Sequence, residues 1–198
     1  ALNYKGLSID VSSTSTDTVY IGTASQIGGG ATAKIFRLTG ATLTDVTNGQ
    51  IPDRYVTDIH VNPNNSQVVY ATLGGFGSGH VFKTTNSGAS WVDITGNLPD
   101  VPHQAVCIDP LYPQNVYIGN DLGVYVSTTG GNTWFEFRSG MPYALVMDLK
   151  VVPSSRKLRV ATHGNGVYQR DLIEFPIGIT QNGNEIPNAF SLKQNYPN

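Results

Sequence analysis

Short phrases of sequence recur along this chain at a spacing of 43 to 50 residues, and no other feature restricts the possible folds as strongly. An alternating apolar segment that ends at a turn occurs four times, as LSIDVSS, TDIHVNP, AVCIDP and MDLKVVP. Its central apolar residue is Ile9, Ile59, Val106 and Leu149 in the four copies, and these lie 50, 47 and 43 residues apart. Spacings of about 40 to 50 residues are typical of β-propeller blades.

Each copy continues with two further predicted strands. The second is rich in β-branched and aromatic residues, and a polar or glycine-rich loop separates it from the third. The third strand has an aromatic residue at the same place in every copy: Phe36, Phe82, Tyr125 and Tyr168. A fourth strand, seen in TLTDVT, WVDIT and TWFEF, closes the first three copies and has no clean equivalent in the last.

A sheet of four short strands cannot bury both of its faces alone, and stacking such sheets around an axis solves the problem. We therefore predict an all-β fold, a β-propeller of about four blades of four antiparallel strands that is part of a larger propeller. The predicted blades span residues 5–48, 55–98, 103–140 and 145–172, within a propeller region of residues 1–172. A sandwich or barrel would not explain why the same phrase recurs in register.

Composition excludes several classes of protein. Asp, Glu, Lys and Arg make up 13% of the residues, roughly half the usual share, and the net charge of −2 leaves no basic surplus for binding nucleic acid. No apolar run approaches the roughly 20 residues of a membrane span. The four histidines are isolated and Cys107 is the single cysteine, so we predict no metal site, no cofactor and a buried thiol, with calcium at an Asp/Asn-rich loop left open.

Two segments between the third and fourth strands, TTNSGASW and STTGGNTW, resemble the Asp-box, or BNR repeat. The resemblance implies a local turn in which a polar side chain caps amides, a glycine takes a special conformation and a tryptophan folds over the hairpin. It also implies that the boxes lie on the propeller face opposite an active site. The third copy departs from the pattern, because Thr129 stands where Asp or Asn is expected. The matching residues are Thr84, Asn86, Gly88, Trp91, Ser127, Gly131 and Trp134.

The segment RVATHGNGVY is similar to the closing blade of sortilin-like and glycosyl-hydrolase-like propellers, which favours a structural loop role for His163. Among enzymes the chain most resembles xyloglucanase-like glycoside hydrolases, which use tandem Asp-box propellers with a catalytic Asp in each. No catalytic residue can be transferred to this sequence. Asp58 and Asp148 occupy equivalent places in two copies, which indicates a repeated structural role. The carboxylates that could serve a glycosidase are Asp53, Asp58, Asp100 and Asp121.

The ligand face of a propeller is built by the loops between second and third strands and by those that join blades. These loops contain aromatic and polar side chains that could stack on a sugar and hydrogen-bond it. The predicted ligand-face residues are Arg54, Tyr55, Phe76, His80, His103, Asp121, Tyr143 and His163.

The C-terminal segment 173–198 has the composition of a linker, and its end, IPNAFSLKQNYPN, resembles the opening of the C-terminal sorting domain of type IX secretion cargo. This resemblance implies the type IX secretion machinery as a partner and a location outside a Gram-negative cell, secreted or at the outer surface. It also leads us to expect that the chain is an excerpt of a longer protein. Four blades are the lower limit of closed propellers and Asp-box propellers generally have six or more, so we expect missing blades before Ala1 or a partner chain that supplies them.

Three functions remain open. The sequence favours a non-catalytic propeller that binds a polysaccharide or a surface protein. The alternatives are a fragment of a xyloglucanase-like glycoside hydrolase and a structural subunit whose blades dock on neighbouring copies.

Overall fold

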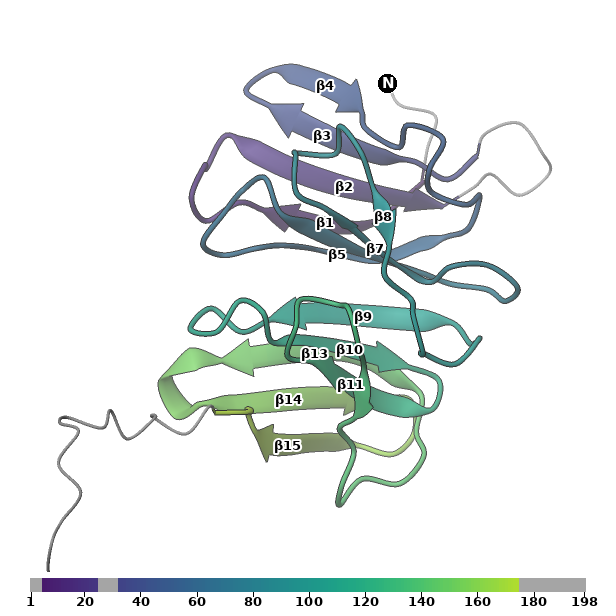
Figure 1. Ribbon diagram of the computed structural model, residues 1–198, viewed down its shortest axis with the longest axis vertical. Coiled ribbons are helices and arrows are strands. Elements are labelled where there is room, and N and C mark those ends of the chain that lie inside the picture. Colours follow the sequence, from purple (N-terminus) through teal and green to yellow (C-terminus); the bar gives the residue numbers. More distant parts are fainter. Residues whose placement is uncertain (1–4, 25–31, 175–198) are drawn as a thin grey trace, which may run out of the picture.

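The computed structural model describes residues 5–24 and 32–174. The segment from residue 175 onward, with the predicted sorting sequence, and the glycine cluster at 28–30 lie outside the described residues. Within them the strands form four antiparallel sheets, each built from consecutive strands of the chain (Figure 1). The predicted all-β fold of repeated small sheets is confirmed.

The sheets, here called blades 1 to 4, follow the sequence repeat. Blade 1 consists of β1 (Lys5–Val11), β2 (Thr18–Ala24), β3 (Ile35–Thr39) and β4 (Thr42–Asp45). Blade 2 consists of β5 (Val56–Val61), β6 (Val69–Leu73), β7 (Val81–Thr84) and β8 (Val92–Asp93).

Blades 3 and 4 have the same order. Blade 3 consists of β9 (His103–Ile108), β10 (Val116–Asn120), β11 (Gly123–Ser127) and β12 (Phe135–Glu136). Blade 4 consists of β13 (Val146–Val152), the short 3-10 turn η1 (Pro153–Ser155), β14 (Lys157–Thr162) and β15 (Val167–Asp171). In the described residues blade 4 therefore has three strands, in agreement with the missing fourth-strand phrase.

The blades pack face to face around their first strands. β1 lies beside β5, β5 beside β9, and β9 beside β13. An apolar core fills the space between each successive pair of blades, centred on Tyr20 and Ile59, on Tyr70 and Ile118, and on Tyr117 and Leu149. Burial between blades removes the apolar faces that a single blade would leave in water.

Side chains of one blade satisfy backbone amides on the inner edge of the next. Asp10 Oδ2 accepts a hydrogen bond from Val61 N at 2.7 Å, and Asp58 Oδ2 accepts one from Val106 N at 2.9 Å. An innermost strand has a free edge whose amides need partners. The acidic residues of the first strands thus join neighbouring blades, which supports the structural role predicted for Asp58.

The turns at residues 84–91 and 127–134 share one hydrogen-bond pattern. Thr84 Oγ1 accepts hydrogen bonds from Asn86 N (3.2 Å) and Gly88 N (2.9 Å). Ser127 Oγ accepts equivalent bonds from Thr129 N (3.2 Å) and Gly131 N (2.9 Å). The departure of Thr129 from the sequence pattern therefore leaves these two bonds in place, whereas the bond from Ser90 N to Asn86 Oδ1 (2.9 Å) in the first turn has no equivalent at Thr129 among the described residues.

The tryptophans of these turns reach beyond their own hairpins. Trp91 Nε1 donates a hydrogen bond to Val46 O (2.7 Å) in the preceding blade, and Trp134 Nε1 donates one to Ile94 O (2.8 Å). Gly131 has φ 107°, and a Cβ there would collide with Ile94. Each turn therefore fastens one blade to the blade before it, a contact that the local sequence pattern does not predict.

Cys107 lies in the core between blades 3 and 4, where burial raises the pKa of its thiol, so the predicted buried cysteine is confirmed. Across the described ranges, the structure contains no helix with the length and apolar character needed to cross a membrane.

Candidate functional site

The first strand of every blade contains a β-bulge close to its start. The register of the first strand with its neighbour shifts at the same place in all four blades, and one residue is left without a partner. A bulge turns a side chain away from its regular direction. The bulged residues are Leu7, Thr57, Gln104 and Met147.

The four bulged side chains line one pocket at the end of the blade axis where the first strands begin. Its volume is about 470 Å³, and Lys5, Ala24 and Tyr55 complete the lining. We call this the mouth pocket. The sequence-based prediction includes Tyr55 and misses the bulged residues, although each lies two positions before a central residue of the repeat and so shares its spacing.

The mouth pocket combines apolar surface with a few polar groups. Tyr55 is 46% exposed, and Leu7 and Met147 are exposed to a similar degree. Gln104 hydrogen-bonds the side chain of Asp121, whose Oδ1 is buried and has no partner among the described residues. Burial raises the pKa of Asp121, and the bond from Gln104 opposes that shift. An apolar lining with few polar groups is typical of small-ligand sites.

A second part of the predicted ligand face is the loop between β6 and β7. Arg54 Nη2 donates a hydrogen bond to Phe76 O at 3.1 Å, and the Phe76 ring is 59% exposed. Asp100 Oδ1 accepts a bond from Gly77 N (2.7 Å) and contacts His80 Nε2 (2.8 Å). The bond from Gly77 N is the main cause of a lowered pKa at Asp100. Arg54, Tyr55 and Phe76 therefore form one exposed group beside the mouth pocket.

His80 and His103 lie beneath these loops. Their side chains are 1% and 0% exposed, and the two rings stack with centroids 4.9 Å apart. His103 Nδ1 lies 2.7 Å from Val101 O, and burial lowers the pKa of His103 to about 4. The structure thus places these two predicted residues in a supporting position, away from the surface that a ligand would contact.

The remaining predicted residues lie on blades 3 and 4. Tyr143 is 63% exposed and stacks against the guanidinium of Arg138, whose Cζ is 3.8 Å from the ring centroid. His163 is exposed in the loop between β14 and β15, and its amide donates to Leu145 O at 2.8 Å. The structure does not bring Tyr143 or His163 into the mouth pocket.

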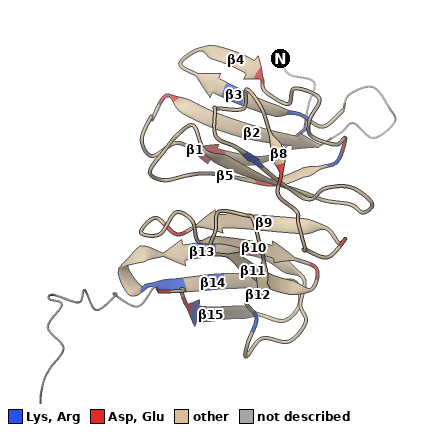
Figure 2. Cartoon of the chain, viewed as in Figure 1, with Lys and Arg blue, Asp and Glu red and all other residues tan. Residues whose placement is uncertain are grey.

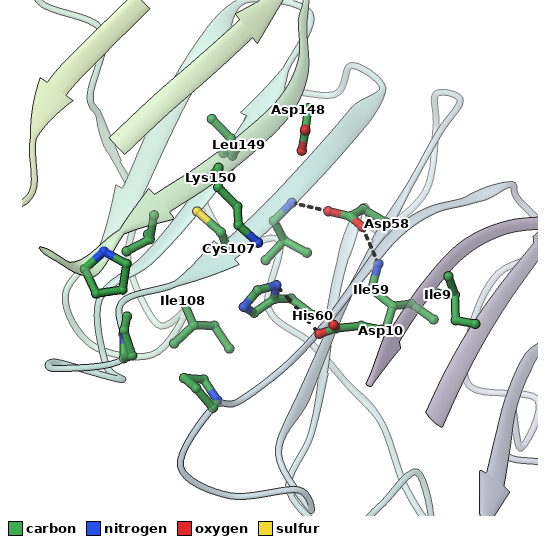
Figure 3. Close-up of a pocket in the computed structure, with 15 residues that line it drawn as sticks. Ile9, Asp10, Asp58, Ile59, His60, Cys107, Ile108, Asp148, Leu149 and Lys150 are labelled. Atoms are coloured by element: carbon green, nitrogen blue, oxygen red, sulfur yellow. Dashed lines mark hydrogen bonds and ion pairs between the residues drawn. The ribbon is translucent and has the colours of Figure 1, made fainter. Parts of the chain in front are cut away.

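The first strands also line an axial pocket of about 450 Å³ on the side of the mouth pocket that faces the first-to-second-strand turns (Figure 3). Burial raises the pKa of Asp58 to about 6, and the nearby charge of Asp148 adds to the shift. Both oxygens of Asp58 are engaged, because Oδ1 accepts from Ser8 Oγ and Ile59 N and Oδ2 from Val106 N.

His60 occupies the same axial pocket (Figure 3). Burial lowers the pKa of His60, the nearby charge of Asp10 opposes this change, and Lys150 adds to it. His60 Nδ1 is 3.8 Å from Asp10 Oδ2. Among the described residues no group of three or more His, Cys, Asp or Glu side chains is arranged to hold a metal ion.

Charged residues of both signs are scattered over the blades (Figure 2). In the described part of the chain they form no continuous basic stripe of the kind that tracks a nucleic-acid backbone.

Comparison with known proteins relates this fold to large propeller proteins. No protein-family model and no curated protein matches the sequence. A GH74 enzyme of Niastella koreensis superposes with a TM-score of 0.67 at 21% identity, over 83% of this chain and 28% of that chain. The GH74 xyloglucanase of Xanthomonas campestris gives 0.64 at 14% identity, over 82% and 28%.

An auxiliary nutrient binding protein of Bacteroides thetaiotaomicron gives a TM-score of 0.58 at 10% identity, over 80% of this chain and 36% of that chain. This chain therefore spans between 28% and 36% of the length of these three solved structures. At these identities the likeness establishes the shared propeller fold.

Proposed function

We propose that this chain is a non-catalytic propeller module that binds a neutral glycan at the mouth pocket. The observation that carries the proposal is the convergence of one bulged side chain from every blade, together with Tyr55, on one pocket. The fold shared with a xyloglucanase and a nutrient binding protein supports a carbohydrate as the ligand class.

The pocket chemistry suits a sugar ring. The exposed Tyr55 ring and the apolar flanks of Leu7 and Met147 offer surfaces for the C–H faces of a sugar. The amide of Gln104 can exchange hydrogen bonds with hydroxyl groups, since an amide both donates and accepts. Thr57 contributes less, because its hydroxyl already bonds His103 O and Thr72 Oγ1.

The proposal includes export from the cell. It is supported by the similarity of IPNAFSLKQNYPN to type IX sorting domains. We also propose that the turns at 84–91 and 127–134 are Asp-box turns, which their shared capping pattern supports. They lie at the end of the blades opposite the mouth pocket, as Asp-boxes do in the families that this chain resembles.

Titration calorimetry with xyloglucan oligosaccharides tests the binding role. We expect Tyr55→Ala and Gln104→Ala each to weaken binding about tenfold, a loss of about 1.4 kcal/mol. Phe135→Ala is the matched control, because Phe135 is a similarly exposed aromatic residue on the outer strand β12 and should bind as the parent does. Unchanged affinity in Tyr55→Ala, or no binding of any neutral plant polysaccharide by the parent, would overturn the proposal.

A hydrolase fragment is the second candidate, and the axial pocket favours it. A general acid needs a raised pKa, and Asp58 and Asp148 place two carboxylates in one pocket. Release of reducing sugar from xyloglucan by the purified chain, lost in Asp58→Asn and Asp148→Asn, would establish this function in place of simple binding. Release that persists in both variants and in Asp121→Asn would remove these carboxylates from consideration.

A further inference from the structure

Two positions of the repeat carry different residues in blade 3. In blades 1 and 2 the fourth strand ends in an aspartate that accepts a hydrogen bond from the backbone amide of a threonine two residues later: Asp45 from Thr47 (2.9 Å) and Asp93 from Thr95 (2.8 Å). In blade 3 these places are taken by Glu136 and Arg138. The equivalence follows from the register, because Val46, Ile94 and Phe137 make the same backbone bond to the third strand of their blades.

The threonine has a structural task in blades 1 and 2. Thr47 Oγ1 accepts a hydrogen bond from Ile35 N (3.0 Å), and Thr95 Oγ1 accepts bonds from His80 N (2.7 Å) and Val81 N (3.1 Å). These amides begin the third strand and would otherwise lack an acceptor.

Another residue performs part of this task in blade 3, at Gly123 N, which corresponds to His80 N in blade 2. Asn120 Oδ1 accepts bonds from Leu122 N (2.9 Å) and Gly123 N (3.1 Å) at the start of β11. Arg138 therefore does not cap the start of the third strand, as Thr47 and Thr95 do in blades 1 and 2.

Arg138 instead lines a cleft between blades 3 and 4 together with Arg170 of β15. The cleft has a volume of about 350 Å³, and we call it the outer cleft. It adjoins a smaller apolar depression of about 150 Å³ with Phe137 and Tyr168 in its lining. The lining of the outer cleft consists of Glu136, Arg138, Ser139, Gly140, Met141 and Arg170.

Aromatic rings hold both guanidinium groups in place. Arg138 stacks on Tyr143 at 3.8 Å, and Arg170 stacks on Phe137 at 4.0 Å. Stacking on a ring orients a guanidinium and leaves its N–H groups, which lie in the plane of the guanidinium, available to a ligand.

The outer cleft has unused hydrogen-bond donors and an excess of positive charge. Arg138 Nη2 pairs with Glu136 Oε2 at 3.1 Å, while its buried Nε has no partner among the described residues. Arg170 makes no ion pair with any of the residues that the structure describes. The cleft contains two guanidinium groups and one carboxylate, so it can bind a further anion. The two parallel N–H groups on one side of a guanidinium can donate to both oxygens of a carboxylate.

We propose that the outer cleft binds the carboxylate of an acidic sugar residue, such as a uronic acid in a plant polysaccharide. The choice of a sugar rests on the glycan-binding function proposed above, whereas the cleft itself is separate from the mouth pocket. The partly exposed Tyr168, which lines the adjoining depression, gives the sugar ring an aromatic surface to pack against, whereas Phe137 and Met141 are buried and support the arginines from below.

Titration calorimetry with galacturonic acid oligosaccharides tests this proposal. We expect binding that weakens with added salt and falls at least tenfold in Arg138→Thr and in Arg170→Gln. Arg138→Thr restores the residue of blades 1 and 2, so the variant should remain folded, which its thermal melting will show. Arg159→Gln is the control, because it removes an exposed arginine of β14 outside the cleft and should leave the affinity unchanged.

The outcomes separate this site from the mouth pocket. Arg138→Thr should retain binding of neutral oligosaccharides, and Tyr55→Ala should retain binding of acidic ones. No binding of galacturonate oligosaccharides, equal affinity in parent and Arg138→Thr, or an equal loss in Arg159→Gln would overturn the proposal. A glutamate-rich peptide that binds more tightly with the same arginine dependence would overturn it in favour of a protein ligand.

Discussion

At the scale of single residues, Asp58 and His103 are buried groups whose pKa values move in opposite ways. Burial raises the pKa of Asp58 from 3.8 to about 6 and lowers that of His103 from 6.5 to about 4. Between these values folded Asp58 holds more protons than unfolded Asp58, so its contribution to the free energy of unfolding falls as pH rises. Folded His103 holds fewer protons than unfolded His103, so its contribution rises with pH over nearly the same range.

We predict that the two effects largely cancel between pH 4 and 6, and that single substitutions reveal each one. In Asp58→Asn the free energy of unfolding should rise with pH, with a slope of up to about 1.4 kcal/mol per pH unit. In His103→Gln it should fall over the same range. Urea denaturation of the parent and both variants at several pH values measures these slopes. Parallel pH profiles for all three proteins would contradict the assignment of raised and lowered pKa values.

At the scale of elements, the turn between the third and fourth strands connects blades. Trp134 is 1% exposed and donates to a carbonyl of blade 2, and Trp91 makes the equivalent contact with blade 1. The bond from Trp91 to Val46 O is buried and the bond from Trp134 to Ile94 O is partly buried, and a polar group left unpaired in such a place is costly.

We predict that Trp134→Phe and Trp91→Phe each lower the free energy of unfolding by about 1 to 3 kcal/mol, because each leaves a carbonyl unpaired and removes packing. Phe135→Leu, at the exposed residue next to Trp134, should change it by less than about 0.5 kcal/mol. Urea denaturation measures all three. If the tryptophan variants were as stable as the control, the turns would be local hairpin features with no part in joining blades.

At the scale of the whole molecule, the two end faces of the blade stack differ in chemistry. The face of blade 1 that points away from blade 2 is apolar, with Ile9 66% exposed, Val11 next to it on β1 and Leu43 on the outer strand β4. The far face of blade 4 is polar, with Lys150, Arg159 and Gln169 paired across its strands. In blades 2 to 4 the face equivalent to the apolar one is covered by the preceding blade, so we infer that another blade covers it in blade 1 as well.

In a solution of this chain alone, such a blade can come only from a second copy. We therefore expect concentration-dependent association in sedimentation velocity, and loss of it when Ile9→Lys and Val11→Lys are combined. Val92→Lys is the control, since Val92 is exposed to a similar degree on the outer strand β8. A parent chain that stays monomeric at every concentration would show that the face needs no cover, and it would count against a role as a structural subunit.

Much of the fold of this protein can be predicted from local sequence patterns. Alternating apolar residues and turn signals define the strands, and their recurrence defines blades that must stack, since a single small sheet cannot bury both faces. The burial of Cys107 follows in the same way, from its place in an apolar strand. The capping pattern at Thr84 and Ser127 is local too, because it joins residues at most four positions apart.

Which side chains meet across blades depends on the three-dimensional packing of the sheets. His80 ends the same loop that exposes Phe76, and His103 begins β9 directly after a loop like that of Tyr55, yet the two rings stack on one another and are buried. The convergence of Leu7 with Met147, and of Arg138 with Arg170, joins residues from separate blades. The physical reason is the distance along the chain over which the interactions act. Strand formation depends on residues close in sequence, whereas the burial of a side chain and the meeting of side chains from different blades depend on how separate sheets pack against one another.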